Sequence, residues 1–366
     1  MLGLYIHIPF CEYLCHYCDF VKQVPKNDEM IDKYIDHLLI ELNDYREYFP
    51  RIETIYIGGG TPSMLSPNQL DRILKSLRSI QASEFTIEVN PESYTHEKGI
   101  VFYTNGVNRI SLGVQSFNDE VLRYVNRHHK EKDIYNVVAD LKSIGIDNVS
   151  IDLIYAIPGQ SIEILKSDLD KAIALDIDHI SCYSLILEEK TFFYHQYIKG
   201  KFNPIENELE AQMFELVIDE LTKNGFEQYE ISNFARNNKY SVHNKIYWTL
   251  NEYIGIGLGA HGFINNERTY NHKSLNKYYE GYQATRVKQN ISDNLTDELV
   301  FGLRLISGIS IKYIEQKYDI KLLDKYPELK DKISLGLVEI SNGYLRLTNK
   351  GIFFGNQVFE VFVWNI

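Results

Sequence analysis

The segment YIHIPFCEYLCHYCDF, residues 5–20, joins an apolar run to three cysteines that lie within eight residues of one another. The run before Cys11 is apolar on both faces, which is typical of a parallel strand buried under helices. Cys11, Cys15 and Cys18 follow where such a strand would end. The chain's fourth cysteine lies far away, so this pattern does not indicate a disulfide framework, and a reducing compartment is expected.

The spacing Cys-x-x-x-Cys-x-x-Cys allows three interpretations. Three thiolates on one loop can hold three irons of a [4Fe–4S] cluster, and the fourth iron then stays open to a ligand from outside the protein. A zinc ion held by Cys15 and Cys18 with His16 or His7 is the second interpretation. A chance group of buried thiols is the third. The spacing favours the iron–sulfur interpretation and leaves the other two open.

The rest of the chain predicts a parallel α/β fold. Apolar runs typical of strands cover residues 3–9, 54–58, 85–90, 109–115, 148–155 and 179–187. Amphipathic helical patterns lie between them, near residues 28–48, 67–80, 95–104, 118–144 and 161–175. Strands that alternate with helices in this way indicate βαβ units and a parallel sheet.

Polar residues at the ends of these strands favour a partial barrel. Cys11, Gly58–Gly60, Glu88, Gln115 and Asp152 lie at or just beyond the C-terminal ends of successive predicted strands. Barrel enzymes collect their chemistry at that rim, whereas an open doubly wound sheet places its ligand at a single switch point. We therefore predict a partial (β/α)6 barrel of the TIM type.

In the last part of the chain, the regular alternation of predicted strands and helices ends. A helix is expected at 205–224, and the glycine-rich apolar run at 253–263 is expected to form a tight loop packed against the sheet. Two further helices are followed by alternating runs on either side of Asn342-Gly343, which predicts a hairpin. The prediction is a barrel unit over residues 1–285 and a small winged-helix-like α+β module over residues 286–366.

Composition narrows the classes of partner. The formal net charge is −12 and the sequence pI is near 5.4, which gives no electrostatic reason to expect nucleic acid. No run approaches the roughly 18 apolar residues of a membrane span. The N-terminus lacks the basic stretch of a signal peptide. A cytoplasmic protein without a transmembrane segment is expected.

Six motifs, taken together and in order, resemble a known group. YIHIPFC, GGGTPS, RISLGVQSF, VNRHH, DLIYAIPGQ and ISCYSLI resemble the radical S-adenosylmethionine (SAM) superfamily, and within it the oxygen-independent coproporphyrinogen III oxidase-like group. The resemblance implies a [4Fe–4S] cluster on Cys11, Cys15 and Cys18, with SAM bound to the open iron through its amino and carboxylate groups. The positions that it implies for SAM contact are Tyr5, Tyr17, Gly59, Gly60, Thr61, Glu88, Gln115, Arg127 and Asp152.

Within that group the chain is more similar to the HemW-type heme chaperones than to the oxidase. The oxidase has a fourth motif cysteine where this chain has Phe20, and a sizeable extension before the cluster motif, whereas Cys11 here follows only ten residues. The chaperones have Asp-Phe after the third cysteine and an H-N-x-x-Y-W motif, here residues 243–248. The resemblance implies heme binding by His243, Tyr247 and Trp248. A histidine packed in the core is the alternative for His243.

Two functions follow from these resemblances. The first is a heme chaperone that passes heme to client hemoproteins such as respiratory enzymes, forms a homodimer, and meets the membrane peripherally through those clients. The second is a radical SAM enzyme, either a coproporphyrinogen III oxidase or one acting on another substrate, that cleaves SAM to a 5′-deoxyadenosyl radical. Radical chemistry would not separate the two, because a chaperone can retain it, so the sequence leaves open whether the protein is an enzyme.

Overall fold

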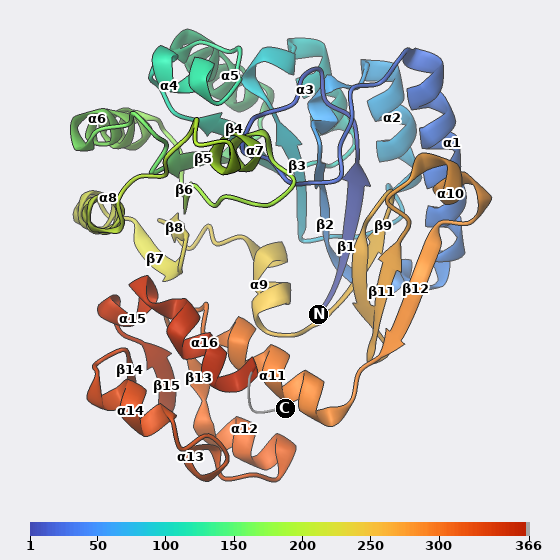
Figure 1. Cartoon of the computed structure of the whole chain (residues 1–366). Coiled ribbons are helices and arrows are strands. Elements are labelled where there is room, and N and C mark those ends of the chain that lie inside the picture. The colour runs from blue at the N-terminus through green and yellow to red at the C-terminus, as the bar shows by residue number, and fades with distance from the viewer. Residues whose placement is uncertain (364–366) are drawn as a thin grey trace.

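The computed structural model of the protein describes residues 1–363 and is built around one large sheet (Figure 1). Its centre is formed by six parallel strands: β1 (Leu2–Ile8), β2 (Ile52–Gly59), β3 (Glu84–Val89), β4 (Arg109–Gln115), β5 (Asn148–Tyr155) and β6 (His179–Ser184). Each of these strands pairs in parallel with the next one along the chain. All six predicted strands are present, and the last ends at Ser184 rather than at residue 187.

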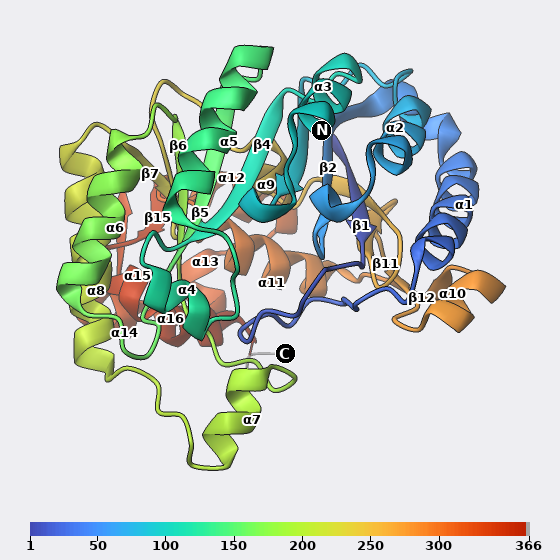
Figure 2. The ribbon, with the colours of Figure 1, turned by 90° about the horizontal axis from the view of Figure 1, so that it is seen from above.

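Helices cover the outer face of these strands, as the view in Figure 2 shows. They are α1 (Asp28–Asp44), α2 (Pro67–Ser76), α3 (His96–Thr104), α5 (Glu131–Ile144), α6 (Ile162–Ala174) and α8 (Asn207–Lys223). Short 3-10 turns precede β2 and follow β2 and β3, at Arg46–Arg51, Pro62–Met64 and Pro91–Ser93. Four of the helices begin where a polar side chain accepts a backbone N–H: Asn27, Ser66, Thr95 and Ser161. Such caps satisfy N–H groups that a helix start would otherwise leave unpaired.

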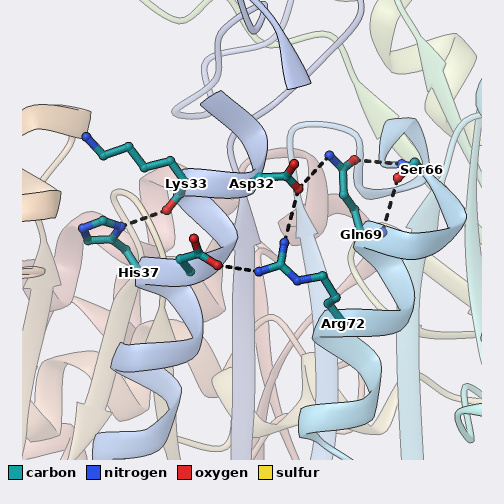
Figure 3. Close-up of polar contacts among 7 residues, drawn as sticks. Asp32, Lys33, His37, Ser66, Gln69 and Arg72 are labelled. Carbon is teal, nitrogen blue, oxygen red and sulfur yellow. Dashed lines mark hydrogen bonds and ion pairs between the residues drawn. The ribbon is translucent and has the colours of Figure 1, made fainter. Parts of the chain in front are cut away.

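A polar network on the outer surface joins α1 to α2 (Figure 3). Asp32 accepts hydrogen bonds from Gln69 Nε2 at 3.1 Å and from Arg72 Nη1 at 3.2 Å. Gln69 also completes a reciprocal cap with Ser66 at the start of α2. The neighbouring helices of the barrel wall are thus linked by exposed polar contacts as well as by their buried apolar faces.

The single helix predicted over residues 118–144 is wrong. The structure has two helices there, α4 (Asp119–Tyr124) and α5, separated by residues 125–130. Asn126 ends α4 with a φ of 62°, a left-handed conformation that Asn tolerates better than most residues. No apolar residue occurs from 126 to 133, so the amphipathic pattern is interrupted at this break, and the single-helix prediction overlooked the gap.

Further strands extend both edges of the central sheet and leave it open. Beyond β6 lie β8 (Asn233–Ala235) and β7 (Glu227–Glu230); beyond β1 lie β9 (Glu252–Ile256), β10 (His261–Ile264), β11 (Glu267–Asn271) and β12 (Gln283–Lys288). The first of these edge neighbours of β1, β9, still runs parallel to it. Because the sheet does not close on itself, the barrel is partial, as predicted.

The loop predicted at residues 253–263 is also wrong, because most of that run belongs to β9 and β10. Glycine lowers strand propensity, but here it permits a close backbone approach. A Cβ at Gly255 would lie 1.8 Å from the carbonyl oxygen of His261. The glycine-rich composition therefore reflects tight packing between strands.

Three short helices complete this part of the chain: α7 (Phe192–Ile198), α9 (Val242–Trp248) and α10 (Leu275–Glu280). Of these, α9 contacts β1, β2 and β9, and on its other side α11 of the C-terminal module. It lies between the large sheet and that module in Figure 1.

The C-terminal module contains helices and a small sheet, as predicted. Its helices are α11 (Ile291–Gly302), α12 (Ile311–Tyr318), α13 (Leu322–Lys325), α14 (Leu329–Ser334), α15 (Asn349–Phe353) and α16 (Gly355–Val363), and its strands are β13 (Ile309–Ser310), β14 (Val338–Ser341) and β15 (Tyr344–Leu347). Asn342 and Gly343 both have positive φ, which is the requirement of a type I′ hairpin turn. The predicted boundary between the barrel unit and this module, after residue 285, falls within β12. Within residues 1–363, no helix combines the length and apolar composition needed to cross a membrane.

Candidate functional site

The cysteine loop begins where β1 ends and folds back on itself. The Cys11 backbone N–H donates to the Gln23 carbonyl at 3.1 Å, and the Gln23 N–H donates to the Pro9 carbonyl at 2.8 Å. Cys11 is buried, while Cys15 and Cys18 are half-buried. The loop therefore presents its thiols at the C-terminal end of the strands, as the sequence predicted.

The break between α4 and α5 receives this loop. The His16 N–H donates to the Val125 carbonyl at 3.2 Å, and His16 Nδ1 lies 2.9 Å from the Tyr124 carbonyl oxygen. The Asn126 side chain donates to the Leu14 carbonyl at 2.8 Å. A continuous helix would leave no free carbonyls here, so the irregular segment is what holds the cysteine loop in place.

The glycine segment after β2 packs directly on the backbone of the cysteine loop. The Gly60 N–H donates to the Ile8 carbonyl and the Thr61 N–H to the Phe10 carbonyl, both at 2.7 Å. The Gly59 N–H donates to Glu88 Oε2 at 3.1 Å. Since these N–H groups already have partners, the segment is not a phosphate cradle.

A half-buried carboxylate lies next to this segment. Glu88 accepts a hydrogen bond from the Tyr56 hydroxyl at 2.8 Å in addition to the one from Gly59. Burial raises the pKa of Glu88 to about 7. On β5, Asp152 accepts a hydrogen bond from Ser111 Oγ at 3.0 Å, and burial also raises the pKa of Asp152.

Gln115 and Arg127 approach the same place from β4 and from the α4–α5 break. The pairing of β4 with β5 shifts register between Gly113 and Gln115, and Gln115 has a φ of 67°. Such a bulge redirects a side chain at the end of a strand. Arg127 donates to the Gly113 carbonyl and lies 3.6 Å from Glu92 Oε2.

One cavity of about 430 Å³ collects these groups. The predicted residues that line it are Cys11, Cys15, Tyr17, Cys18, Gly59, Gly60, Thr61, Glu88, Gln115, Arg127 and Asp152. Tyr5 lies outside the lining; its hydroxyl bonds His7 Nδ1 at 2.8 Å and its ring stacks on Tyr56. The exposed residues Phe20 and Ile186 lie at the mouth.

Comparison with known proteins agrees with this geometry. The Radical SAM superfamily model matches residues 5–172, and the HemN C-terminal domain model matches residues 292–354. The heme chaperone HemW of Bacillus subtilis (strain 168) is 38% identical over 99% of both chains. The chain belongs to the HemW family of radical SAM proteins. The HemW of Escherichia coli (strain K12) is 32% identical over 99% of this chain and 98% of its own.

The HemW family likeness extends to a solved oxidase structure. Coproporphyrinogen III oxidase (HemN) from Escherichia coli, described as a radical SAM enzyme, superposes with a TM-score of 0.85. It is 26% identical, and the match covers 99% of this chain and 89% of that one. The partial barrel and the C-terminal module therefore belong to one shared architecture.

The second motif that resembles the HemW family, on α9, is built as a packed core. His243 is fully buried; its Nδ1 lies 2.8 Å from Thr54 Oγ1 and its Nε2 lies 2.8 Å from the Tyr247 hydroxyl. Trp248 stacks against the Arg304 guanidinium, which lies 4.4 Å from the ring centroid. None of the three residues predicted for heme lines the cavity. Coordination of heme by His243 would require α9 to leave Thr54, and heme binding there stays a prediction.

The donor set fits an iron–sulfur cluster better than a single ion. Within residues 1–363, no three His, Cys, Asp or Glu side chains gather tightly enough to hold one metal ion. A zinc site needs four ligands at about 2.0 to 2.3 Å from one atom, whereas the thiols of a cluster each bind a different iron. Burial raises the pKa of Cys11 to about 11, so metal binding would release the thiol proton.

Several lining residues were missed at the sequence level. Glu92 lies beside Arg127, and His129 Nδ1 lies 3.2 Å from Glu92 Oε2. Arg109 and Asn244 line the cavity far from the cysteine loop along the chain. The sequence could have revealed Arg109, because a charged residue at the first position of a buried strand needs a polar partner inside the fold.

Proposed function

We propose that this chain is a HemW-type heme chaperone that binds a [4Fe–4S] cluster and SAM, binds heme, and transfers it to client hemoproteins. The proposal rests on the residues that lie at the mouth of the cavity, in a chain that matches known heme chaperones over almost its full length. Three thiols line the cavity together with Phe20, which takes the place of the oxidase's fourth cysteine and exposes 59% of its surface.

Cys11, Cys15 and Cys18 would hold the cluster, which supplies an open iron for the amino and carboxylate groups of SAM when it is bound. The glycine segment supports this arrangement, since its N–H groups are already paired within the protein and it lines the cavity beside the thiols. Glu88 holds the segment through the Gly59 N–H. Gln115, Arg127 and Asp152 offer further polar contacts on the opposite wall.

Heme is proposed to approach at the mouth. Phe20, Tyr183 and Ile186 line it and expose 59%, 39% and 67% of their surfaces. Apolar and aromatic side chains suit the face of a flat macrocycle. The alternative through His243 depends on movement of α9, as described above.

A coproporphyrinogen III oxidase is the second candidate, favoured by the end-to-end superposition on that enzyme. Turnover separates the two functions. Anaerobically reconstituted protein with SAM and a reductant should bind heme and should not convert coproporphyrinogen III to protoporphyrinogen IX. Conversion at a catalytic rate would overturn the chaperone proposal.

The cluster is tested by replacing one thiol at a time. Cys15→Ala should lose iron and acid-labile sulfide, because only two ligands remain. Cys182→Ala is the matched control, since Cys182 is a buried thiol of β6 outside the cavity. Equal iron content in the two variants would contradict the assignment.

Transfer is tested by mixing the heme-loaded protein with an apo-hemoprotein and following the client's heme absorbance. Transfer faster than from heme in free solution supports the chaperone, and equal rates count against it. Sedimentation with and without the cluster tests the proposed homodimer. Flotation with vesicles that carry a client tests the proposed peripheral contact with the membrane.

A further inference from the structure

The cavity continues far below the mouth. Arg109 is the first residue of β4 and Gln115 is the last, and both line the cavity. Six residues of a strand span about 20 Å. At the lower end the first turn of α9 forms the floor, where Ser241 and Asn244 belong to the lining. The cavity therefore has a deep end that is distinct from the cysteine loop.

Arg109 is a buried cation at this deep end. Only 2% of its surface is exposed. Its Nη1 donates to Asn148 Oδ1 at 3.2 Å and to the Lys239 carbonyl at 3.5 Å. Among residues 1–363, no carboxylate lies within 4.0 Å of its guanidinium nitrogens, and both acceptors of Nη1 are neutral oxygens. A buried guanidinium without an anion is costly.

The acidic residue on the same wall does not fill this role. Asp152 lies beyond ion-pair distance from Arg109, and its carboxylate accepts the hydrogen bond from Ser111. Burial raises the pKa of Asp152, while the charge of Arg109 acts at longer range to lower it. Within residues 1–363, Arg109 makes no ion pair at contact distance, and it lines the cavity.

Asn244 supplies a second set of donors at the floor. Its backbone N–H donates to Ser241 Oγ, but its side-chain amide has no hydrogen-bond partner in the part of the chain that the structure describes. Asn244 belongs to the H-N-x-x-Y-W motif. In the same motif, both ring nitrogens of His243 are hydrogen-bonded within the core. The residue of the motif that faces the cavity is thus an amide.

We propose that the floor of the cavity binds the carboxylate group of a ligand, held by Arg109 and by the Asn244 amide. A guanidinium and a carboxylate match in a planar, two-point geometry. Arg109 and Asn244 are not among the residues assigned to the cluster or to SAM, and the proposal does not depend on the proposed function. The carboxylate belongs either to a free small molecule or to a propionate arm of a tetrapyrrole.

The test is calorimetric titration of reconstituted, SAM-saturated protein with sodium propionate, at constant ionic strength against chloride. Wild type should bind propionate saturably, and Arg109→Gln should bind it at least tenfold more weakly, because a charge-assisted hydrogen bond is lost. Arg51→Gln is the matched control, since Arg51 is exposed and outside the cavity. Asn244→Ala keeps the buried cation and should also bind more weakly, so the test does not depend on folding of the Arg109 variant.

A second arm identifies the source of the carboxylate. If it is a heme propionate, hemin should bind wild type at least tenfold more tightly than hemin dimethyl ester, and Arg109→Gln should remove that difference. If propionate binds but hemin and its ester bind alike, the ligand is a free carboxylate. Absence of propionate binding and of any ester effect, or equal binding by wild type and both variants, overturns the proposal. If only heme binding fails, the proposed function is contradicted. The propionate titration still tests the carboxylate site in that case.

Discussion

Two regions of this molecule carry motifs that resemble those of known heme chaperones, and they are built in opposite ways. At the mouth of the cavity, the thiols of Cys11, Cys15 and Cys18 face an open volume. On α9, His243 has both ring nitrogens in hydrogen bonds within the protein, and its side chain is fully buried. The thiols at the mouth are open to a ligand, whereas the ring nitrogens of His243 on α9 are already hydrogen-bonded within the protein. Two motifs that resemble the same family can therefore differ in whether their side chains are free to bind a ligand.

The largest expected effect on stability comes from His243→Ala. The change removes a buried ring that stacks on Tyr56 and leaves Thr54 and Tyr247 without their shared partner. We expect the free energy of unfolding to fall by about 3 to 4 kcal/mol, from the lost packing and the unpaired hydroxyls. Denaturant titration of wild type and variant measures it.

Tyr247→Phe is the control for this change, because it removes one hydroxyl and keeps the ring. It should cost about 1 kcal/mol. If His243→Ala is as stable as wild type but loses a heme absorption band, α9 is a ligand site and the contrast between the two regions fails.

The two regions should also respond to pH in opposite directions. Burial raises the pKa of Glu88 near the mouth to about 7. The folded state then holds its proton more tightly than the unfolded state does, so the Glu88 contribution is lost as pH rises from about 4.5 to about 7, by up to about 3 kcal/mol. Glu88→Gln should flatten that limb of the stability profile.

Burial lowers the pKa of His243 on α9 to about 3. The unfolded state binds the proton more readily, so the His243 contribution is present above about pH 6.5 and is lost as pH falls toward 3. Subtracting the stability profile of His243→Ala from that of wild type should isolate this acid limb. A difference that does not change with pH would show that His243 is not buried in solution.

Gly60→Ala tests how closely the mouth is packed. A Cβ there would lie 2.6 Å from the Phe10 carbonyl oxygen and 2.8 Å from that of Ile8. The backbone must shift, at a cost of about 2 kcal/mol, and the shift should lower the retention of iron. Gly281→Ala is the matched control, because nothing lies within 4 Å of its Cβ and its φ of 175° is extended. An iron content equal to wild type in Gly60→Ala would mean that the loop tolerates displacement.

The sequence predicted the mouth better than the floor for a physical reason. Strands that alternate with helices place their C-terminal ends at one rim, so Cys11, Glu88 and Asp152 could be brought together from periodicity alone. The contact of His243 with Thr54 spans 189 residues, and no local pattern specifies it. The same limit hid Arg109 and Asn244, which line one cavity only because α9 closes the lower end of the barrel.

The two wrong predictions of secondary structure both involve a distant partner. Residues 126–133 contain no apolar side chain, and the break between α4 and α5 gives the cysteine loop the carbonyls of Tyr124 and Val125, so a tertiary demand overrides local propensity. The glycines at residues 252–264 suggested a loop. In the structure they are required by close packing between strands, not by a turn. In both cases the decisive partner is distant in sequence.

The smallest effect is expected away from both regions, at Arg72 on the outer surface of α2. Its guanidinium contacts Asp32 and Asp36 of α1, and all three side chains are well exposed. Exposed ion pairs are screened by water and salt, so Arg72→Ala should change the free energy of unfolding by less than about 1 kcal/mol. The residual effect should shrink as salt is raised. This variant gives the baseline against which His243→Ala is judged: a loss at Arg72 as large as the loss at His243 would mean that burial is not what distinguishes α9 from the surface.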